Sequence, residues 1–490
     1  MHWLGSFSLL VLLAAVDAGI FKCPTNAITS LPTNGVIPAG ATDRTQVPGY
    51  TNCTVTFQIP DGYAVKLLIT SSGIEGLDSV IVIDTVGMKQ QTPPSVVNYV
   101  MWFASGTAYL NIQSPTGSLY FFATYQYVSL STFAKKQTYT GSYFSAQLAP
   151  NTVYTMSTIA NDQVAVTVAK PNTQKVDTIA QMIYVYDGDN ILKSRMIGRL
   201  SDLAKTKDRI YSSGKSVSFV CFYDQGSVKS VSYILGNDKS MVSSLSSYSA
   251  VTVSQGNQFR GSMKVIGQTT VGSATTFICV DCSVMYFNQL KFDNTGASTT
   301  GSIILQGLTP TQRMPNTIRY DAQFYTSAQM PQIIPTRMFT MYVRSTSVSV
   351  TISTNALSWY TPADKRTGFI LSPNQWDPAQ PSTFDYTFRN DSQLFTYTVG
   401  FTHMSYGTVS DNLSLQIGPT NGNPTINNNY PETSTSNKQV SSVGNYMKVA
   451  LINGSPATAV SLTFSMDVYK AASGSSFILS CLLVILIYIG

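Results

Sequence analysis

Charged side chains and histidine are both scarce in this chain of 490 residues. Asp, Glu, Lys and Arg together make up 11% of it, and its two histidines are His2 and His403. Surface helices depend on residues such as Glu, Lys and Ala, so this composition argues against a helical fold. The net charge is +6, but the Lys and Arg residues form no dense cluster. Contact with a phosphate backbone needs such a cluster, so we do not expect nucleic acid as a partner.

The shortage of histidine excludes several kinds of catalytic site. His2 lies in a segment that we expect to be removed, so a Ser-His-Asp or Cys-His site could form only around His403. The sequence around His403 resembles a strand and contains no GxSxG motif. Zinc hydrolase chemistry with several histidine ligands is excluded as well. We therefore expect a protein that is not an enzyme and that needs no cofactor.

Apolar segments at both ends of the chain indicate processing. Residues 1–18 contain an aliphatic core, Leu9–Val16, followed by Val16-Asp17-Ala18, which is typical of a secretory signal peptide. The apolar segment Phe477–Ile489 is shorter than the ~20 residues that a membrane-spanning helix needs. Small residues precede it, so residues 471–490 are interpreted as a GPI-attachment signal, with a tilted tail anchor as the alternative. The candidates for lipid attachment are Ala471, Ala472, Ser473 and Gly474.

The residues that are abundant, Ser, Thr, Tyr and Val, are typical of strands with one buried face and one hydroxyl-rich face. Similar turn sequences precede alternating runs in four places, which indicates an internal repeat, although such turns are also common in unrelated loops. We predict an all-β chain of tandem antiparallel β-sandwich domains. The predicted domains are 19–130, 131–240, 241–356 and 357–470.

Five cysteines remain once the signal peptide and the tail are set aside, and a secreted chain makes disulfides the default. Cys23 and Cys53 bracket the start of the first segment, and we pair them. Cys279 and Cys282 have CxxC spacing, but a strand precedes them where a redox site would need a helix, and no second ligand pair for zinc stands nearby. We expect structural disulfide use there, with Cys221 as the favoured partner, which leaves one cysteine over.

One stretch resembles a known domain. The apolar run Met182–Tyr186 precedes the turn Asp187-Gly188-Asp189-Asn190, and Tyr211-Ser212-Ser213-Gly214 precedes the run Val217–Phe222. This order resembles the centre of a CUB domain, a small extracellular β-sandwich, and its cysteine-poor form resembles the CUB-like proteins of nematodes. In the first segment, Asp78–Asp84 matches the CUB pattern DxLxVxD in form, although a Thr replaces the usual Gly after it. The third and fourth segments match less well.

The resemblance implies a cell-surface glycoprotein that recognises extracellular protein or glycan ligands through its end loops and edge strands. It further implies a role in innate immunity, in defence against pathogens or in stress responses, with membrane-raft residence following from the anchor. Many CUB domains bind calcium through a Glu and two Asp residues. Glu75 and Asp78 could supply two of these ligands, but the later acidic ligand is missing. The alternative is that both carboxylates cap turns.

Asn-X-Ser/Thr sequons mark candidate glycosylation sites on exposed backbone of a secreted chain. They begin at Asn52, Asn390, Asn412 and Asn453.

Two other functions remain open. A carbohydrate-active enzyme on a β-sandwich would need two carboxylates that flank a sugar bond, and Asp187 with Asp224 or Asp364 with Asp377 could be nominated. A passive surface-coat protein would need no ligand at all.

Overall fold

The computed structural model describes residues 21–172, 178–207, 209–223, 230–256, 258–264, 272–293, 301–431 and 438–470. The expected signal peptide, the apolar tail and the lipid-attachment candidates Ala471, Ala472, Ser473 and Gly474 lie outside the described residues. Within them, no helix is both long enough and apolar enough to cross a membrane.

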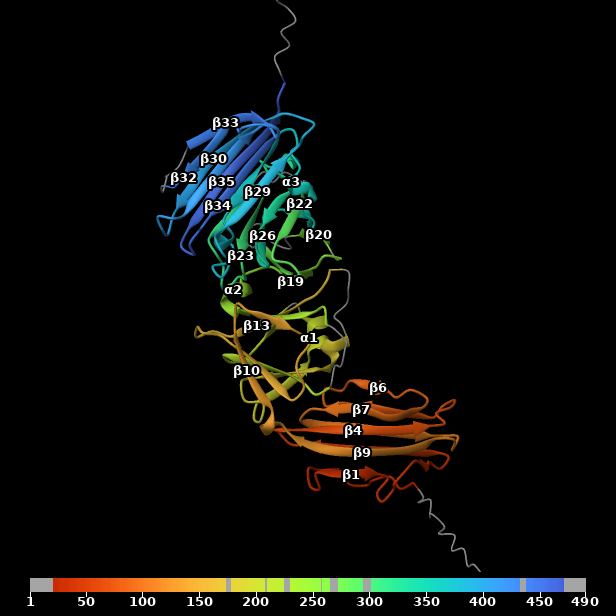
Figure 1. The fold of residues 1–490 in the computed structure, drawn as a ribbon. Helices are drawn as coiled ribbons and strands as arrows, with labels where there is room; N and C mark the ends of the chain where they lie inside the picture. Colours follow the sequence, from red (N-terminus) through yellow and green to blue (C-terminus); the bar gives the residue numbers. More distant parts are fainter. Residues whose placement is uncertain are drawn as a thin grey trace, which may run out of the picture.

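The predicted all-β fold is confirmed, because strands dominate and the helices are all short. The described strands form eight sheets, which fall into four consecutive pairs along the chain. We call these pairs units 1 to 4. Figure 1 shows them following one another from the red unit 1 to the blue unit 4, with the two described chain ends far apart.

Unit 1 consists of one sheet of four strands and one of five. The first is β3 (Thr51–Ile59), β8 (Gly106–Ser114), β5 (Ser79–Ile83) and β6 (Lys89–Gln91). The second is β1 (Asn34–Ile37), β9 (Tyr120–Ser129), β4 (Tyr63–Ser72) and β7 (Val96–Phe103), with β2 (Thr45–Gln46) paired to β9. Strand β3 alternates between exposed and buried residues, as its sequence predicts. Its buried Val55 and Phe57 meet Leu67 and Phe121 from the other sheet, so the pair is a sandwich.

Unit 2 has the same two-layer construction. One sheet is β10 (Ala134–Tyr139), β12 (Thr152–Ser157), β17 (Ser216–Cys221), β14 (Ile183–Asp187) and β15 (Arg195–Arg199). The other is β11 (Tyr143–Ser145), β18 (Tyr233–Asp238), β13 (Val164–Ala169) and β16 (Ile210–Tyr211). The short helices are η1 (Leu130–Thr132), η2 (Thr178–Met182), α1 (Leu200–Thr206) and α2 (Lys239–Ser243).

Unit 3 follows the same plan. One sheet is β19 (Tyr248–Val253), β21 (Ser273–Cys279), β26 (Met338–Arg344), β23 (Ser302–Gly307) and β24 (Asn316–Asp321). The other is β20 (Phe259–Lys264), β27 (Ser347–Ser353), β22 (Met285–Phe292) and β25 (Gln332–Ile334), and η3 (Ser327–Gln329) precedes β25. The pairs β10–β12 and β19–β21 are parallel, in otherwise antiparallel sheets.

Unit 4 contains two sheets of four strands. They are β28 (Arg366–Leu371), β35 (Ala459–Val468), β30 (Phe395–Ser405) and β33 (Lys438–Gly444), and β29 (Phe384–Arg389), β34 (Tyr446–Ile452), β31 (Asn412–Gly418) and β32 (Ile426–Tyr430). The short helices α3 (Leu357–Tyr360) and η4 (Pro373–Gln375) flank β28.

The position of strand β14 between two units explains why its sequence is an unbroken apolar run. Ile183 and Val185 point into the core of unit 2. Tyr184 and Tyr186 point the other way and pack in a second cluster with Ala64 and Trp102 of unit 1. A strand that is buried on both faces needs apolar side chains at successive positions. The apolar run therefore marks the joint between units 1 and 2.

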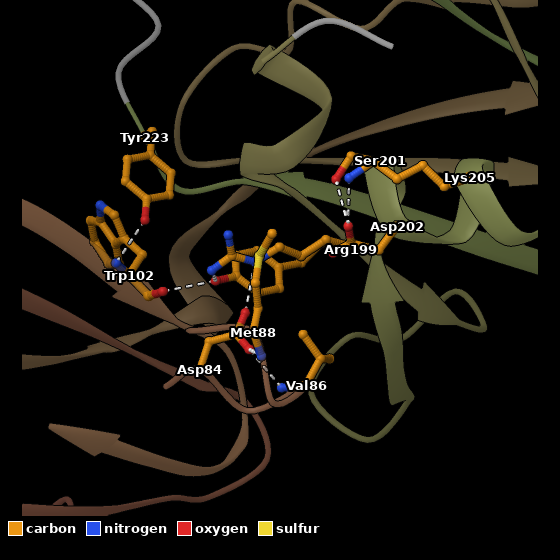
Figure 2. Close-up of polar contacts among 10 residues, drawn as sticks. Asp84, Val86, Met88, Trp102, Arg199, Ser201, Asp202, Lys205 and Tyr223 are labelled. Carbon is orange, nitrogen blue, oxygen red and sulfur yellow. Dashed lines mark hydrogen bonds and ion pairs between the residues drawn. The ribbon is translucent and has the colours of Figure 1, made fainter. Parts of the chain in front are cut away.

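A buried ion pair crosses this joint (Figure 2). Arg199 Nε lies 2.7 Å from Asp84 Oδ2, and the two side chains are only 6% and 1% exposed. Asp84 Oδ1 also accepts hydrogen bonds from the amides of Val86 and Met88, at 3.0 and 2.8 Å. Both oxygens of the Asp84 carboxylate therefore lie within 3.0 Å of a nitrogen of the guanidinium or of a backbone amide. A buried charge requires such partners.

The guanidinium extends this network through the aromatic layer. Arg199 Nη2 donates to Tyr184 Oη at 3.1 Å, and Tyr184 Oη donates to the Trp102 carbonyl at 2.8 Å. Tyr223 Oη accepts from the Trp102 amide at 3.0 Å, as Figure 2 shows. Burial raises the pKa of the Tyr184 hydroxyl well above its usual value, so this hydroxyl stays protonated and can donate. Burial alone would lower the pKa of Arg199, but Tyr184 and Asp84 raise it.

The other joints are also buried. Ala165 and Ala169 of β13 pack with Tyr248 and Ala250 of β19 between units 2 and 3. Between units 3 and 4, the Gln332 side chain donates to the Phe369 carbonyl at 2.8 Å and accepts from the Phe369 amide at 3.0 Å. No β-carbon would fit at Gly307, because it would lie 1.7 Å from the Trp376 carbonyl oxygen. The units therefore form a continuous array of packed layers.

Asp84→Asn tests the first joint. The substitution leaves the Arg199 charge buried without its counter-charge, which should lower the free energy of unfolding of the transition that includes units 1 and 2 by about 3–5 kcal/mol. Urea unfolding followed by tryptophan fluorescence measures the loss. The matched control is Asp385→Asn, which removes the more exposed pair between Asp385 and Lys448, 2.9 Å apart, and should have a much smaller effect. Equal losses would contradict a structural role for the buried pair.

An ionised carboxylate is also built into unit 4. Asp411 is fully buried and accepts hydrogen bonds from the amides of Gly407, Thr408 and Ser455 and from the Thr408 hydroxyl. The Thr458 hydroxyl donates to it as well. Burial alone would raise the pKa of Asp411, but these hydrogen bonds outweigh it and hold the pKa well below its usual range.

The folded pKa of Asp411 lies below the unfolded value of about 3.9, so its stabilisation is complete above that pH and is lost as the pH falls below it. Unit 4 should therefore unfold at progressively lower temperature as the pH falls below about 4. Asp411→Asn should lower the melting temperature at neutral pH and flatten this dependence, because the new amide NH2 faces amide donors. Calorimetry at several pH values measures both, with the exposed Asp467→Asn as control. An unchanged acid profile in the Asp411 variant would contradict the assignment.

Candidate ligand-binding surface

The end of unit 1 that lies away from unit 2 carries exposed apolar side chains. The joint takes up the end where β4 begins and β5 and β7 finish, since Ala64, Asp84 and Trp102 lie there. At the opposite end, Tyr50 is 94% exposed and Leu77 78% exposed. Loops on a rigid scaffold often carry the residues that bind partners, so these two exposed side chains make this end a candidate recognition surface. We call this end of unit 1 the free end.

Asp78 holds two loops of the free end together. Its Oδ1 accepts a hydrogen bond from the Thr116 amide at 3.1 Å, and its Oδ2 accepts one from the Thr116 hydroxyl at 2.5 Å. The Asp78 amide donates to the Glu75 carbonyl at 2.9 Å, which closes the turn before β5. Next to Thr116, Gly117 adopts a φ of +78° and comes close to Gly49 of a third loop. The loops that carry Tyr50 and Leu77 therefore rest on a fixed base.

Glu75 and Asp78, the predicted calcium ligands, lie in different surroundings. Asp78 is 3% exposed, and both of its carboxylate oxygens already accept hydrogen bonds from Thr116, while Glu75 is exposed. Neither belongs to a group of three clustered ligand side chains within the described residues. Calcium takes six to eight oxygen ligands. The residues present do not fit such a site well, and we derive no function from calcium.

The disulfides join Cys23 to Cys53 and Cys279 to Cys282. The bond that we favoured between the CxxC pair and Cys221 is not formed. The physical reason is that Cys221 belongs to the core of unit 2 and Cys279 to the core of unit 3. Cys221 is buried, and its thiol donates to the Tyr223 carbonyl at 3.4 Å.

The sequons lie at strand ends and on exposed strand faces. Asn52 is exposed on β3. Asn390 follows β29, Asn412 begins β31 and Asn453 follows β34, so these three belong to the same sheet of unit 4. Of them, Asn453 is exposed, and Asn390 and Asn412 are half-buried. Modification of these residues stays a prediction.

The described carboxylates nominated for a glycosidase each accept a hydrogen bond from a backbone amide. Asp187 accepts from the Ser213 amide at 2.8 Å, Asp364 from the Val468 amide at 2.9 Å and Asp377 from the Ala379 amide at 2.9 Å. Asp224 lies outside the described residues. These three carboxylates thus accept hydrogen bonds from backbone amides, as carboxylates that cap turns do. His403 is exposed on β30.

The sequence predicts no role in a joint for Arg199, Trp102 or Tyr223, although they organise the joint between units 1 and 2. A signal existed for part of it: the aromatic run of β14 has apolar residues at successive positions, so its second face must meet a partner. Nothing local identifies the partner, because Asp84 and Arg199 lie far apart in the chain.

Comparison with known proteins gives one family match. Residues 18–131 match the model of the CUB-like domain, which is 114 of the 490 residues. No curated protein matches the chain.

Among solved structures, the CUB1-EGF-CUB2 domain of human MASP-1/3 is 14% identical, with 42% of this chain and 99% of that chain covered and a TM-score of 0.17. The full extracellular region of zebrafish Gpr126/Adgrg6 is 11% identical, with 69% and 54% covered and a TM-score of 0.19. These likenesses are too distant over the whole chain to carry a functional conclusion.

Asp78→Ala should release the loops of the free end. The loss of the two Thr116 hydrogen bonds should lower the free energy of local opening by about 1–3 kcal/mol and speed amide exchange at Thr116 accordingly. Hydrogen exchange followed by mass spectrometry measures it. Glu75→Ala is the control, because the Glu75 side chain is exposed and only its backbone takes part. Equal exchange in both variants would refute the bracing role of Asp78.

Proposed function

We propose that the chain is a non-enzymatic extracellular protein whose CUB-like unit 1 binds a protein or glycan ligand at its free end. The observation that carries this proposal is the asymmetry of unit 1. One of its ends is buried against unit 2, and the other presents Tyr50 and Leu77 to solvent from loops braced by Asp78. Rigid loops bind at a lower cost in conformational entropy than mobile ones.

Several features support a binding role over a catalytic one. The mature chain has His403 as its one expected imidazole, and that side chain is exposed on a strand. The described carboxylates nominated for a glycosidase each accept a hydrogen bond from a backbone amide, as capping carboxylates do. Aromatic side chains such as Tyr50 supply large contact areas at binding surfaces.

The cellular setting is part of the same proposal. The signal peptide and the GPI-attachment signal would place the chain at the outer leaflet of the plasma membrane, with raft residence. Units 2 to 4 would then hold the free end of unit 1 away from the lipid, because units 1 and 4 lie at opposite ends of the array (Figure 1) and the attachment candidates follow unit 4 in the sequence. The resemblance to nematode CUB-like proteins supports an innate-immune or stress role, and it supports CUB-like repeats in the later units. Release by phosphatidylinositol-specific phospholipase C tests the anchor.

The binding proposal is tested with arrays of extracellular proteins and glycans probed with the full chain. The double variant Tyr50→Ser, Leu77→Ser should reduce binding to each ligand found by tenfold or more, since buried anchor residues dominate interface energies. The control is Ile159→Ser, which changes a side chain in unit 2 that is 82% exposed. A ligand that binds the double variant as tightly as it binds the Ile159→Ser control would show that its site lies away from the free end. No saturable ligand at all would favour a passive coat protein, and sugar hydrolysis abolished by one Asp→Asn change would favour the enzyme.

A further inference from the structure

A small hollow opens at the joint between units 2 and 3. It measures about 140 Å³ and is lined by β13, by the end of α1, by β16 and by β19. This is well above the ~10–15 Å³ that a single water molecule needs. Since the lining comes from both units, whatever fills the hollow contacts both sides of the joint.

The lining of the hollow includes a buried hydroxyl that has no hydrogen-bond partner among the described residues. Ala165, Thr167 and Ala169 lie on one face of β13, because side chains alternate along a strand, and the two alanines pack against unit 3. Thr167 is 5% exposed, and its Oγ1 has no hydrogen-bond partner among the described residues. A buried hydroxyl left in this state lowers the stability of the fold, because it has given up its hydrogen bonds to water without replacing them. A group that accepts its hydrogen bond would remove that loss.

The charged part of the lining is entirely positive. Lys170, just after β13, and Lys207, just after α1, both line the hollow, and no carboxylate is part of the lining. Neither ammonium group forms an ion pair with a described residue, whereas six other basic side chains of the described residues do so at distances up to 3.9 Å, among them Arg199 and Lys448. Two cations beside an unpartnered hydroxyl complement an anion with several oxygens.

The other polar groups of the lining are already occupied. Tyr248 Oη accepts from Asn237 Nδ2 at 3.0 Å and shares a hydrogen bond with the Thr276 hydroxyl at 2.7 Å. The Ser249 hydroxyl shares one with Thr275 at 2.7 Å. The rest of the lining is mainly aliphatic, so a bound charge would be shielded from water on that side. The groups left to bind a ligand are therefore Thr167, Lys170 and Lys207.

We propose that this hollow binds an oxyanion group, carried either by an inorganic anion or by an acidic sugar. The Thr167 hydroxyl donates a hydrogen bond to one oxygen, and the ammonium groups of Lys170 and Lys207 neutralise the charge from the rim. A bound anion stabilises the folded joint by mass action, because it binds only when units 2 and 3 are packed together. The site is separate from the free end of unit 1 and does not depend on what binds there.

Isothermal titration of the full chain with sodium phosphate, sodium sulfate and N-acetylneuraminate, at constant ionic strength, tests the proposal. At least one should bind saturably. The double variant Lys170→Gln, Lys207→Gln should weaken its affinity tenfold or more, and Thr167→Val should weaken it several-fold. The control Lys291→Gln removes an exposed lysine of unit 3 and should leave the affinity unchanged.

The pattern across the three probes identifies the source. Binding of phosphate or sulfate without N-acetylneuraminate assigns the site to free inorganic anions, and tighter binding of N-acetylneuraminate assigns it to acidic sugars. The proposal is overturned if none of the three binds saturably, or if the double lysine variant binds as the wild type does. Should Thr167→Val fail to fold, the double lysine variant still decides, because Lys207 is exposed and Lys170 is only half-buried.

Discussion

The structure depends on sheets that are buried on both faces. In an isolated sandwich one face of each sheet packs inward and the other meets water, which gives strands of alternating polarity. Units 2 and 3 break this pattern where they meet their neighbours. Tyr184 and Tyr186 of β14 face unit 1, while Ala165 and Ala169 of β13 face unit 3. The second faces turn separate sandwiches into one continuous array.

Within the first joint, the ion pair between Asp84 and Arg199 has a different role from the apolar layer around it. Burial of apolar surface supplies the stability of the joint, whereas the attraction between two buried charges roughly balances the cost of their desolvation. The pair instead fixes one relative placement, since any other packing would leave two charges without partners. Its link through Tyr184 to the Trp102 backbone ties that placement to β7. The orientation of the free end of unit 1 follows from this joint.

The sequence predicts the fold class well, because alternation in β3 and similar strands is a local property that survives in the structure. It also singles out Asp78, as a calcium ligand or alternatively a turn cap, and in the structure the partners of Asp78 are the amide and hydroxyl of Thr116. The joints between units are harder to predict from the sequence. The apolar run of β14 shows that a second face is covered, but pairing Asp84 with Arg199 requires knowledge of how two units pack. For the same reason, Cys221 and the CxxC pair could not be separated, since spacing does not reveal which core each occupies.

The buried layer and the ion pair together should fix the joint between units 1 and 2 in one arrangement. Distance measurement by double electron–electron resonance, with spin labels at Val97 of unit 1 and Ile159 of unit 2, tests it most directly. Both positions are well exposed, at 73% and 82%, so the labels should not disturb either core. A buried, charge-matched joint predicts a single narrow distance distribution in the folded chain. A broad distribution would show that unit 1 moves freely on unit 2, and would contradict the account.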